Sequence, residues 1–324
     1  MTILNLWSWI DMKLYKLTFR PISSLTRIPD AQTIFGSVCS ILVHTQGEQK
    51  LQEYFNSLLS NQPIFVHSSM FVDNVLPMPK IGLISIHDKN QRVTNLSPKE
   101  QLKYITSLKE LKTIEYISID VYKKYILTNQ FENLKNDILN HKLYVQDGIV
   151  SNENTFYPMK KQLFVHTNRA TDLDDKKLFY DENLFMSNNA KLCMYVKTDD
   201  KDYVENIFKY IPYFGIGNRI TIGKNGFKFL KMEEIHVPNY QNEYRVLLSK
   251  CLDASDFDLD GSSYMIESTL YSGAKYYSSN KIGRFNPFIE GSFMKVRQSR
   301  QYYGKILKTN NGKDIYHYGI GFVL

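Results

Sequence analysis

Cysteine is scarce in this sequence: only Cys39, Cys193 and Cys251 occur, and they lie far apart. They form no CxxC pair and are odd in number, so the spacing excludes a disulfide framework. Such cysteine usage is typical of a reducing compartment, and we expect a cytoplasmic location. Each thiol is expected to pack as a small hydrophobic side chain.

Long apolar runs are also lacking. No stretch approaches the roughly 20 residues that cross a bilayer. The N-terminal MTILNLWSWID has neither the basic region nor the long apolar core of a signal peptide. Because a strand-like pattern begins at Met12, we expect residues 1–11 to be an N-terminal extension. From the lack of a long apolar run we expect no membrane partner.

Paired catalytic side chains are the third absence. The seven histidines are scattered, and no two stand at metal-ligand spacing. No Ser-His-Asp or Cys-His arrangement can be argued from spacing either. The sequence therefore predicts a protein that is not an enzyme and has no cofactor or bound metal.

One segment does match a metal-binding pattern. In DFDLDGSSYMIE, the ligand positions of a calcium loop are occupied by Asp256, Asp258, Asp260 and Glu267. The flanks lack the paired amphipathic helices of such sites, and Ser263 stands where an apolar residue is usual. We therefore expect an acidic loop joining two strands, with a calcium-dependent interaction module as an alternative.

The abundant residue types, hydrophobic, aromatic and positively charged, indicate a folded core and an anionic partner. Hydrophobic residues make up 43% of the chain and aromatic residues 14%, which argues against wholesale disorder. The net charge is +7 and the pI is about 9.0. This modest excess of positive charge fits a polyanion such as nucleic acid.

Apolar periodicity predicts an α+β fold. A strand is expected at Lys13–Arg20, then a helix from Ala31 with Asp30 as its N-cap. The later elements are a strand at Ile64–His67, a helix at Pro98–Lys112, hairpin strands at Leu178–Met186 and Lys191–Lys197, a helix at Lys201–Tyr213 and a strand at Phe227–Lys231. This β-α-β-β-α-β order is the ferredoxin-like pattern, which RNA-recognition motifs share.

The same pattern suggests a division of the chain. We expect a ferredoxin-like domain at 12–232, with a large insertion at about 86–160. Strand-like runs dominate from 233 to 324. This second domain is expected to be β-rich, and a degenerate ferredoxin-like unit is one form that it could take.

A glycine-rich segment, GIGNRITIGKNGFKF at Gly215–Phe229, separates the last predicted helix from the strand that follows it. Its glycine spacing, and its place after a helix, fit neither the NTPase phosphate loop nor the dinucleotide fingerprint. Such a loop can present backbone N–H groups and cations to phosphates, although its glycines can equally serve turn geometry alone. The segment after the first strand carries Arg20, Ser23, Ser24 and Arg27, and both segments could reach one RNA backbone.

Five blocks of the sequence resemble the RAMP superfamily of CRISPR RNA-binding proteins, and within it the type III-A (Csm) subunits that cap the 5′ handle of the guide RNA (crRNA). The blocks are KLYKLTFR with the helix TIFGSVCSIL, the serine pair with LPMPK at Ser68–Lys80, NRATDLDDKKLFYDENLF, GIGNRITIGKNGFKF, and EGSFMK with YHYGIGFVL. The resemblance spans most of Lys13–Leu324 and is weak over about Ile86–Lys160. It departs from the family pattern at TIGKNGF.

The resemblance implies a non-catalytic scaffold that holds the crRNA 5′ handle. It also implies that the chain joins a large polymerase-like subunit to the backbone RAMP subunits of an antiviral complex, with the insertion as a thumb. The implied RNA-binding residues are Arg20, Ser23, Ser24, Arg27, Ser68, Ser69, Lys80, Asn168, Arg169, Thr171, Gly215, Ile216, Gly217, Asn218, Arg219, Lys224 and Asn225.

A second function stays open within the same superfamily. Some RAMP proteins cleave CRISPR repeat RNA with a histidine as general base. In this sequence that residue would be His67, next to the serine pair. A repeat-processing endoribonuclease is therefore the alternative.

Overall fold

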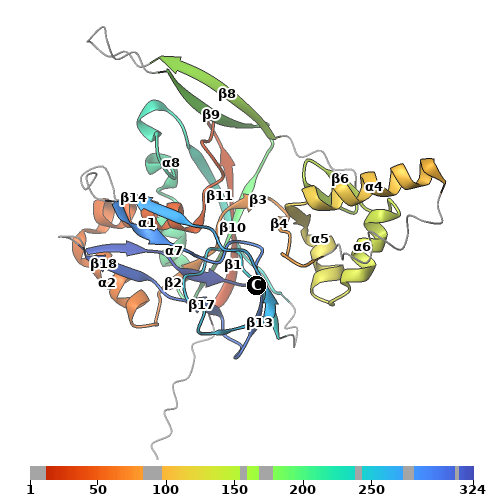
Figure 1. Ribbon diagram of the computed structural model, residues 1–324. Helices are drawn as coiled ribbons and strands as arrows, with labels where there is room; N and C mark the ends of the chain where they lie inside the picture. Colours follow the sequence, from red (N-terminus) through yellow and green to blue (C-terminus); the bar gives the residue numbers. More distant parts are fainter. Residues whose placement is uncertain are drawn as a thin grey trace, which may run out of the picture.

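The computed structural model describes residues 12–82, 97–153, 159–167, 178–237, 243–272, 281–310 and 314–324. At its centre lies an antiparallel sheet in the order β11–β1–β10–β2, with β3 also beside β10 (Figure 1). The strands are β1 (Lys13–Pro21), β2 (Phe65–His67), β3 (Phe71–Val72), β10 (Leu192–Thr198) and β11 (Phe227–Glu234). β1 lies between β10 and β11, the last strand of this sheet in chain order, and this order confirms the predicted ferredoxin-like arrangement.

Alternation of apolar residues explains how β1 takes its place in this sheet. Tyr15, Leu17 and Phe19 are buried, and the ring of Phe19 contacts Phe208 at a centroid distance of 6.1 Å. Phe208 ends the helix α7 (Lys201–Phe208), so this face of β1 packs against the helices. All seven residues of β10 are buried, which means that both faces of the sheet are covered at that strand.

The helices that follow β1 and β10 complete the ferredoxin-like unit. They are α1 (Ala31–Gln46) and α2 (Glu48–Leu59), then α7 and α8 (Ile211–Phe214). Asp30 caps α1 as predicted, since its Oδ1 accepts a hydrogen bond of 2.9 Å from the backbone N–H of Thr33. The single helix predicted at Lys201–Tyr213 is wrong, because it is split into α7 and α8 with Pro212 in the first turn of the second helix. Over the described residues, none of the helices combines the length and apolar character that crossing a membrane requires.

The segment between β3 and β10 forms two further units. The first is a four-stranded sheet in the order β4–β5–β7–β6, with helices beside it. Its elements are β4 (Val75–Pro77), α4 (Pro98–Thr113), β5 (Tyr116–Ser118), α5 (Ile119–Val121), the π-helix η1 (Tyr122–Ile126), α6 (Phe131–Leu139), β6 (Tyr144–Gln146) and β7 (Ile149–Ser151). Figure 1 shows this unit to one side of the central sheet.

The second unit is a hairpin of β8 (Met159–Thr167) and β9 (Leu178–Met186), which extends away from the central sheet (Figure 1). The predicted hairpin of Leu178–Met186 with Lys191–Lys197 is therefore wrong. β9 pairs with β8 along its whole length, whereas β10 pairs with β1 and β2. The local pattern identifies each strand, but the choice of partner depends on contacts that the pattern does not contain.

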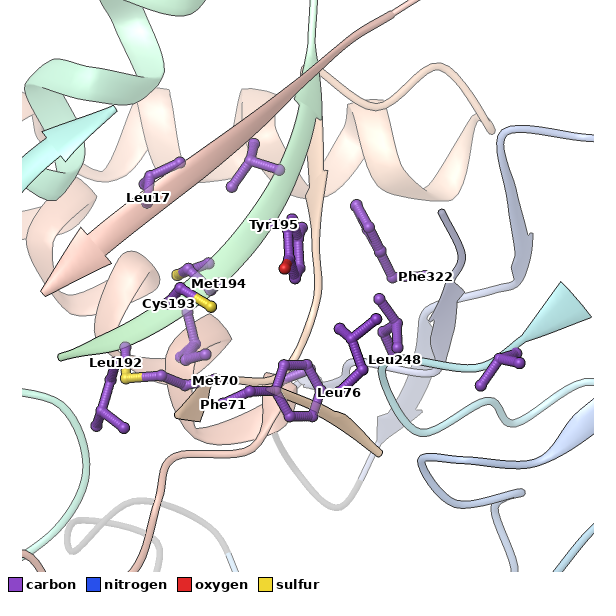
Figure 2. Packing of buried hydrophobic residues seen from close by; sticks show 14 of the residues in the cluster. Leu17, Met70, Phe71, Leu76, Leu192, Cys193, Met194, Tyr195, Leu248 and Phe322 are labelled. Carbon is purple, nitrogen blue, oxygen red and sulfur yellow. The ribbon is translucent and has the colours of Figure 1, made fainter. Parts of the chain in front are cut away.

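The C-terminal region is rich in strands, as predicted. They are β12 (Tyr244–Val246), β13 (Phe257–Ser263), β14 (Thr269–Ser272), β15 (Lys281–Phe285), β16 (Phe293–Val296), β17 (Tyr302–Gly304), β18 (Leu307–Asn310), β19 (Asp314–His317) and β20 (Ile320–Phe322). Leu248 and Phe322 pack with Leu17 and Tyr195 of the central sheet in one core cluster (Figure 2). The core therefore runs across the proposed division at 232/233, and that division stays a prediction.

Candidate nucleic-acid interface

Two loops meet at one end of the central sheet. The first loop, residues 22–30, follows β1, and the second loop, residues 215–226, connects α8 to β11. The backbone N–H of Ile22 donates to the carbonyl of Gly226 at 3.0 Å, and that of Asn225 donates to the carbonyl of Ser24 at 2.9 Å. The hydroxyl of Ser23 accepts a hydrogen bond of 2.9 Å from the backbone N–H of Gly226. The two loops thus continue the pairing of β1 with β11 and form one surface.

Backbone conformation explains the glycines of the second loop. Gly215, Gly217 and Gly223 have φ angles of +66°, +110° and +82°, where any side chain is strained. A Cβ at Gly215 would also lie 2.9 Å from the carbonyl oxygen of Asn225. Turn geometry therefore accounts for these glycines. The loop also contains exposed Asn218 and Arg219, half-buried Lys224, and buried Ile216 and Asn225.

Exposed cations stand at the adjoining ends of β1 and β11. Arg20 lies directly opposite Lys228 in the register of the two strands, and both are exposed. Like charges in directly opposed positions destabilise a sheet. Within the described part of the chain, neither side chain forms an ion pair with a carboxylate. Sequence reasoning missed Lys228, because only the strand register places it beside Arg20.

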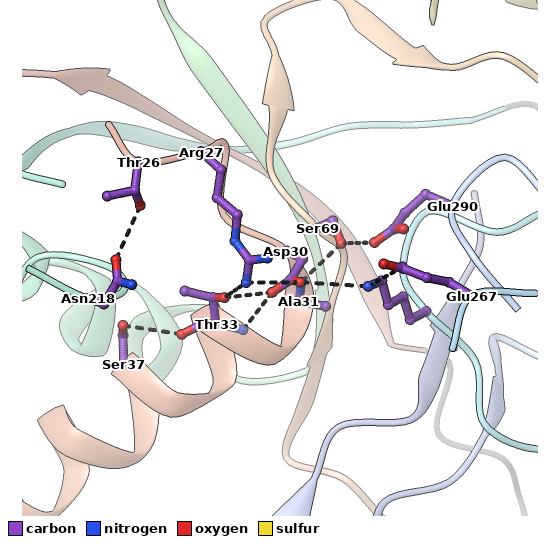
Figure 3. A network of polar contacts seen from close by, with 11 residues as sticks. Thr26, Arg27, Asp30, Ala31, Thr33, Ser37, Ser69, Asn218, Glu267 and Glu290 are labelled. Atoms are coloured by element: carbon purple, nitrogen blue, oxygen red, sulfur yellow. Dashed lines mark hydrogen bonds and ion pairs between the residues drawn. The ribbon is translucent and has the colours of Figure 1, made fainter. Parts of the chain in front are cut away.

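Arg27 lies in the first loop, near the start of α1 (Figure 3). Its Nη2 donates to Oγ1 of Thr33 at 3.1 Å and lies 3.4 Å from Oδ2 of Asp30, while 66% of its side chain is exposed. The second loop reaches the same place, since a Cβ on Gly217 would lie 3.3 Å from Cγ2 of Thr33. The structure therefore brings Arg27 and the glycine loop together.

The serine pair lies inside the molecule. The Ser68 hydroxyl donates to the carbonyl of Ser69 at 2.6 Å and accepts from the backbone N–H of Tyr195 at 2.9 Å. The Ser69 hydroxyl donates to Oε1 of Glu290 at 2.6 Å and accepts from the backbone N–H of Ala31 at 2.9 Å (Figure 3). Burial raises the pKa of Glu290. Both hydroxyls are thus committed to internal hydrogen bonds, and Ser69 ties the start of α1 to the C-terminal region.

Lys80 stands apart from the two loops. The backbone N–H of Lys80 donates to the carbonyl of Gly291 at 2.8 Å, which places Lys80 beside the C-terminal region. Asn168, Arg169 and Thr171 fall outside the described residues. The base of the β8–β9 hairpin does reach the first loop, because Leu25 and Leu184 exchange backbone hydrogen bonds of 2.9 and 2.8 Å.

The candidate general base of the alternative function is fully buried. His67 is 0% exposed, and its ring stacks on Tyr318 with a centroid distance of 4.4 Å. Its Nδ1 lies 3.1 Å from the carbonyl oxygen of Ser68. Burial lowers the pKa of His67 to about 4. In this position the imidazole has no access to an RNA phosphodiester.

The segment that matches the calcium pattern is not the acidic loop expected from the sequence. Most of it forms the strand β13 beside β16. Its carboxylates pair with three separate cations: Asp256 with Arg300 at 2.8 Å, Asp258 with Lys295 at 3.4 Å, and Glu267 with Lys250 at 2.6 Å. The extended backbone, held in a sheet, differs from the tight turn of a calcium loop.

Comparison with solved structures places this fold among subunits of CRISPR complexes. A chain from the crystal structure of a Csm3–Csm4 subcomplex of the type III-A CRISPR–Cas interference complex matches with a TM-score of 0.65 at 17% identity, covering 96% of this chain and 98% of that one. A chain from a Csm1–Csm4 cassette in complex with AMPPNP matches with a TM-score of 0.54 at 16% identity, covering 96% and 97%. No protein-family model and no curated protein matches the sequence. This chain therefore shares, over nearly its whole length, the fold of Csm subunits from type III-A CRISPR complexes.

Proposed function

We propose that this chain is a non-catalytic, crRNA-binding scaffold of a type III-A CRISPR complex, and that the two joined loops hold the 5′ handle. The observation that carries the proposal is the Arg20–Lys228 pair, two exposed cations side by side with no carboxylate partner in the described residues. A phosphate bound there would offset their repulsion. Arg27 and Arg219 extend this positive surface over the adjoining loops.

The chemistry of single-stranded RNA fits such a surface. Cations neutralise phosphates and release counterions, while exposed backbone and side-chain amides bond to phosphate oxygens and 2′-hydroxyls. Asn218 and Ser24 lie in the two loops beside the cations. The similarity of fold supports a place in a type III-A complex, since Csm4 is named with Csm3 in one similar structure and with Csm1 in another. By analogy, this chain would contact both a backbone subunit and a large subunit.

Removing the paired cations tests the proposal. We expect the double variant Arg20→Ala/Lys228→Ala to bind single-stranded RNA about tenfold more weakly, a loss of about 1.4 kcal/mol. The slope of log K against log salt should become shallower by about 1.4, since each single-strand phosphate contact contributes about 0.7. Fluorescence anisotropy of the full-length protein over a salt series measures both quantities.

A charge-matched control distinguishes an RNA site at the two loops from non-specific attraction of RNA by the net positive charge of the protein. Lys50→Ala/Lys308→Ala removes the same net charge from two lysines that already pair with Glu53 at 2.6 Å and with Asp314 at 2.8 Å. This control should bind RNA as the wild type does. Equal losses in both double variants would contradict an RNA site at the two loops.

His67 provides a test against the endoribonuclease alternative and a pH prediction. The pKa of His67 is about 4 in the folded protein and about 6.5 when unfolded. Above pH 6.5 both states are neutral. As the pH falls from 6.5 to 4 the unfolded chain takes up the proton first, so the free energy of unfolding should drop by up to about 1.4 kcal/mol per pH unit. His67→Phe keeps a ring against Tyr318 and should remove that part of the dependence.

Urea unfolding at pH 7 and at mildly acidic pH measures this difference between His67→Phe and the wild type. The same two proteins, incubated with CRISPR repeat RNA without added metal, should both leave it intact. Cleavage by the wild type that His67→Phe abolishes would establish the endoribonuclease instead. An identical pH dependence in the two proteins would contradict the buried neutral imidazole.

A further inference from the structure

Asn225 lies buried between the two loops, although asparagine is strongly polar. Only 1% of its surface is exposed, and its φ angle is +57°. Asparagine tolerates this left-handed conformation better than most side chains. Its backbone N–H and carbonyl bond to Ser24 at 2.9 Å and to Ile216 at 3.2 Å. A buried polar group of this kind is stable only when its hydrogen bonds are satisfied.

The side-chain amide of Asn225 forms hydrogen bonds with both loops at once. Its Oδ1 accepts a hydrogen bond of 2.8 Å from the backbone N–H of Thr26 in the first loop. Its Nδ2 donates to the carbonyl oxygen of Asn218 in the second loop at 2.6 Å, and to Oγ1 of Thr26 at 3.1 Å. Thr26 and Asn218 also bond directly through their side chains at 3.2 Å (Figure 3). One amide therefore fixes the separation of the two loops.

The residues that this amide holds are the immediate neighbours of two exposed arginines. Thr26 precedes Arg27, and Asn218 precedes Arg219. Each hydrogen bond fixes the peptide from which one of these long side chains departs. Without it, the separation of the two guanidinium groups would have to be set when RNA binds, at a cost in conformational entropy.

We propose that Asn225 is a positioning residue of the RNA site: it sets the spacing of Arg27 and Arg219 and does not itself touch RNA. This inference rests on the proposed function and assigns Asn225 a different part in it from direct RNA contact. Its amide groups are already engaged within the protein, and its side chain is not at the surface. The phosphate contacts then come from the exposed side chains around it.

The central variant is Asn225→Gly, which removes the amide but keeps the left-handed backbone free of strain. We expect it to bind single-stranded RNA about fivefold to tenfold more weakly, which is about the loss of one well-oriented phosphate contact. The loss should be the same for oligo(U) and oligo(A). Arg27→Ala/Arg219→Ala removes the guanidinium groups directly and should lose at least as much. Circular dichroism at the assay temperature checks that each variant is folded.

Coupling between these changes is the decisive measurement. If Asn225 acts through the two arginines, adding Asn225→Gly to Arg27→Ala/Arg219→Ala should cause almost no further loss of RNA affinity. Losses that simply add would show that Asn225 acts independently, and the inference would be wrong. A loss that differs between oligo(U) and oligo(A) would show direct base contact and would also overturn it.

The proposed function fails in a different way. If Arg27→Ala/Arg219→Ala and Arg20→Ala/Lys228→Ala both bind RNA as the wild type does, the two loops are not the RNA site. If these variants lose affinity while Asn225→Gly does not, the site stands and the positioning inference fails.

Discussion

Replacing Gly304 by alanine is expected to lower the free energy of unfolding by about 3–4 kcal/mol, combining backbone strain with steric overlap. Gly304 ends β17 and has a φ angle of +70°. A Cβ there would lie 2.6 Å from Sγ of Cys251 and would also overlap the carbonyl oxygen of Gly319. Because one obstacle is backbone, a side-chain rotation cannot relieve the overlap.

Two other glycines separate the contributions. Gly47 has φ and ψ angles of +88° and 169°, a region that glycine alone adopts readily, and no atom lies within 4 Å of the place that a Cβ would take. Gly47→Ala should therefore show strain alone, about 2 kcal/mol. Gly36 lies inside α1 with nothing within 4 Å, so Gly36→Ala should stabilise by about 0.5–1 kcal/mol. Urea unfolding of the three variants measures the series. A Gly304→Ala protein no less stable than Gly47→Ala would contradict the close approach at Cys251.

The position of Gly304 explains the size of this effect. β17 pairs with β20, and Tyr303 packs with Phe257 at a ring-centroid distance of 5.2 Å. Among the described residues these two rings belong to a small core cluster separate from that of the central sheet. Cys251 is fully buried in the same cluster. Moving β17 away from β20 would therefore open that core and the strand pair together.

Local sequence patterns predicted the elements of the central sheet other than β3, because the information they need is local. The alternation in β1, the capping carboxylate of Asp30 and the apolar face of α7 are each visible within about one turn or a few residues. The pairing of β9 with β8 is not local in this sense. The strand assignment of Phe257–Ser263 also depends on a distant partner, β16, which overrides the acidic composition.

The candidate site was predictable to the extent that it follows from topology. In a β-α-β-β-α-β sheet the first and last strands are neighbours, so Arg20, Arg27 and the glycine loop had to meet. The burial of Ser68 was not predictable, because it depends on the backbone of Tyr195, far along the chain. Lys228 was missed for the same reason, since its importance comes from the residue opposite it and not from its own sequence context.

Gly217→Asp is expected to weaken RNA binding more than any other single change in the second loop, by at least about tenfold. The glycine has a φ angle of +110°, and a Cβ would lie 3.3 Å from Cγ2 of Thr33 and 3.5 Å from Nδ2 of Asn225. A carboxylate there would stand at the start of α1, which favours negative charge. It would also lie near Arg27, whose guanidinium bonds to Thr33. The new carboxylate would thus compete with phosphate for Arg27 and repel the RNA.

Gly223→Asp is the matched control for this change. It adds the same charge to the same loop, and its φ angle of +82° imposes a similar strain, but no atom lies within 4 Å of its Cβ position. Both variants should therefore lose about 1–2 kcal/mol of stability through backbone strain, whereas RNA affinity should fall by only about twofold in Gly223→Asp. Anisotropy with single-stranded RNA and thermal unfolding of the same samples measure both effects. If the two variants bind RNA equally, a charge in the loop affects binding only through the overall electrostatic potential of the protein, and Gly217 does not face the RNA. If Gly217→Asp fails to fold while Gly223→Asp folds, the main effect of the substitution at Gly217 is steric contact with Thr33. Gly217→Ala, which adds the Cβ without the charge, then measures that steric effect alone.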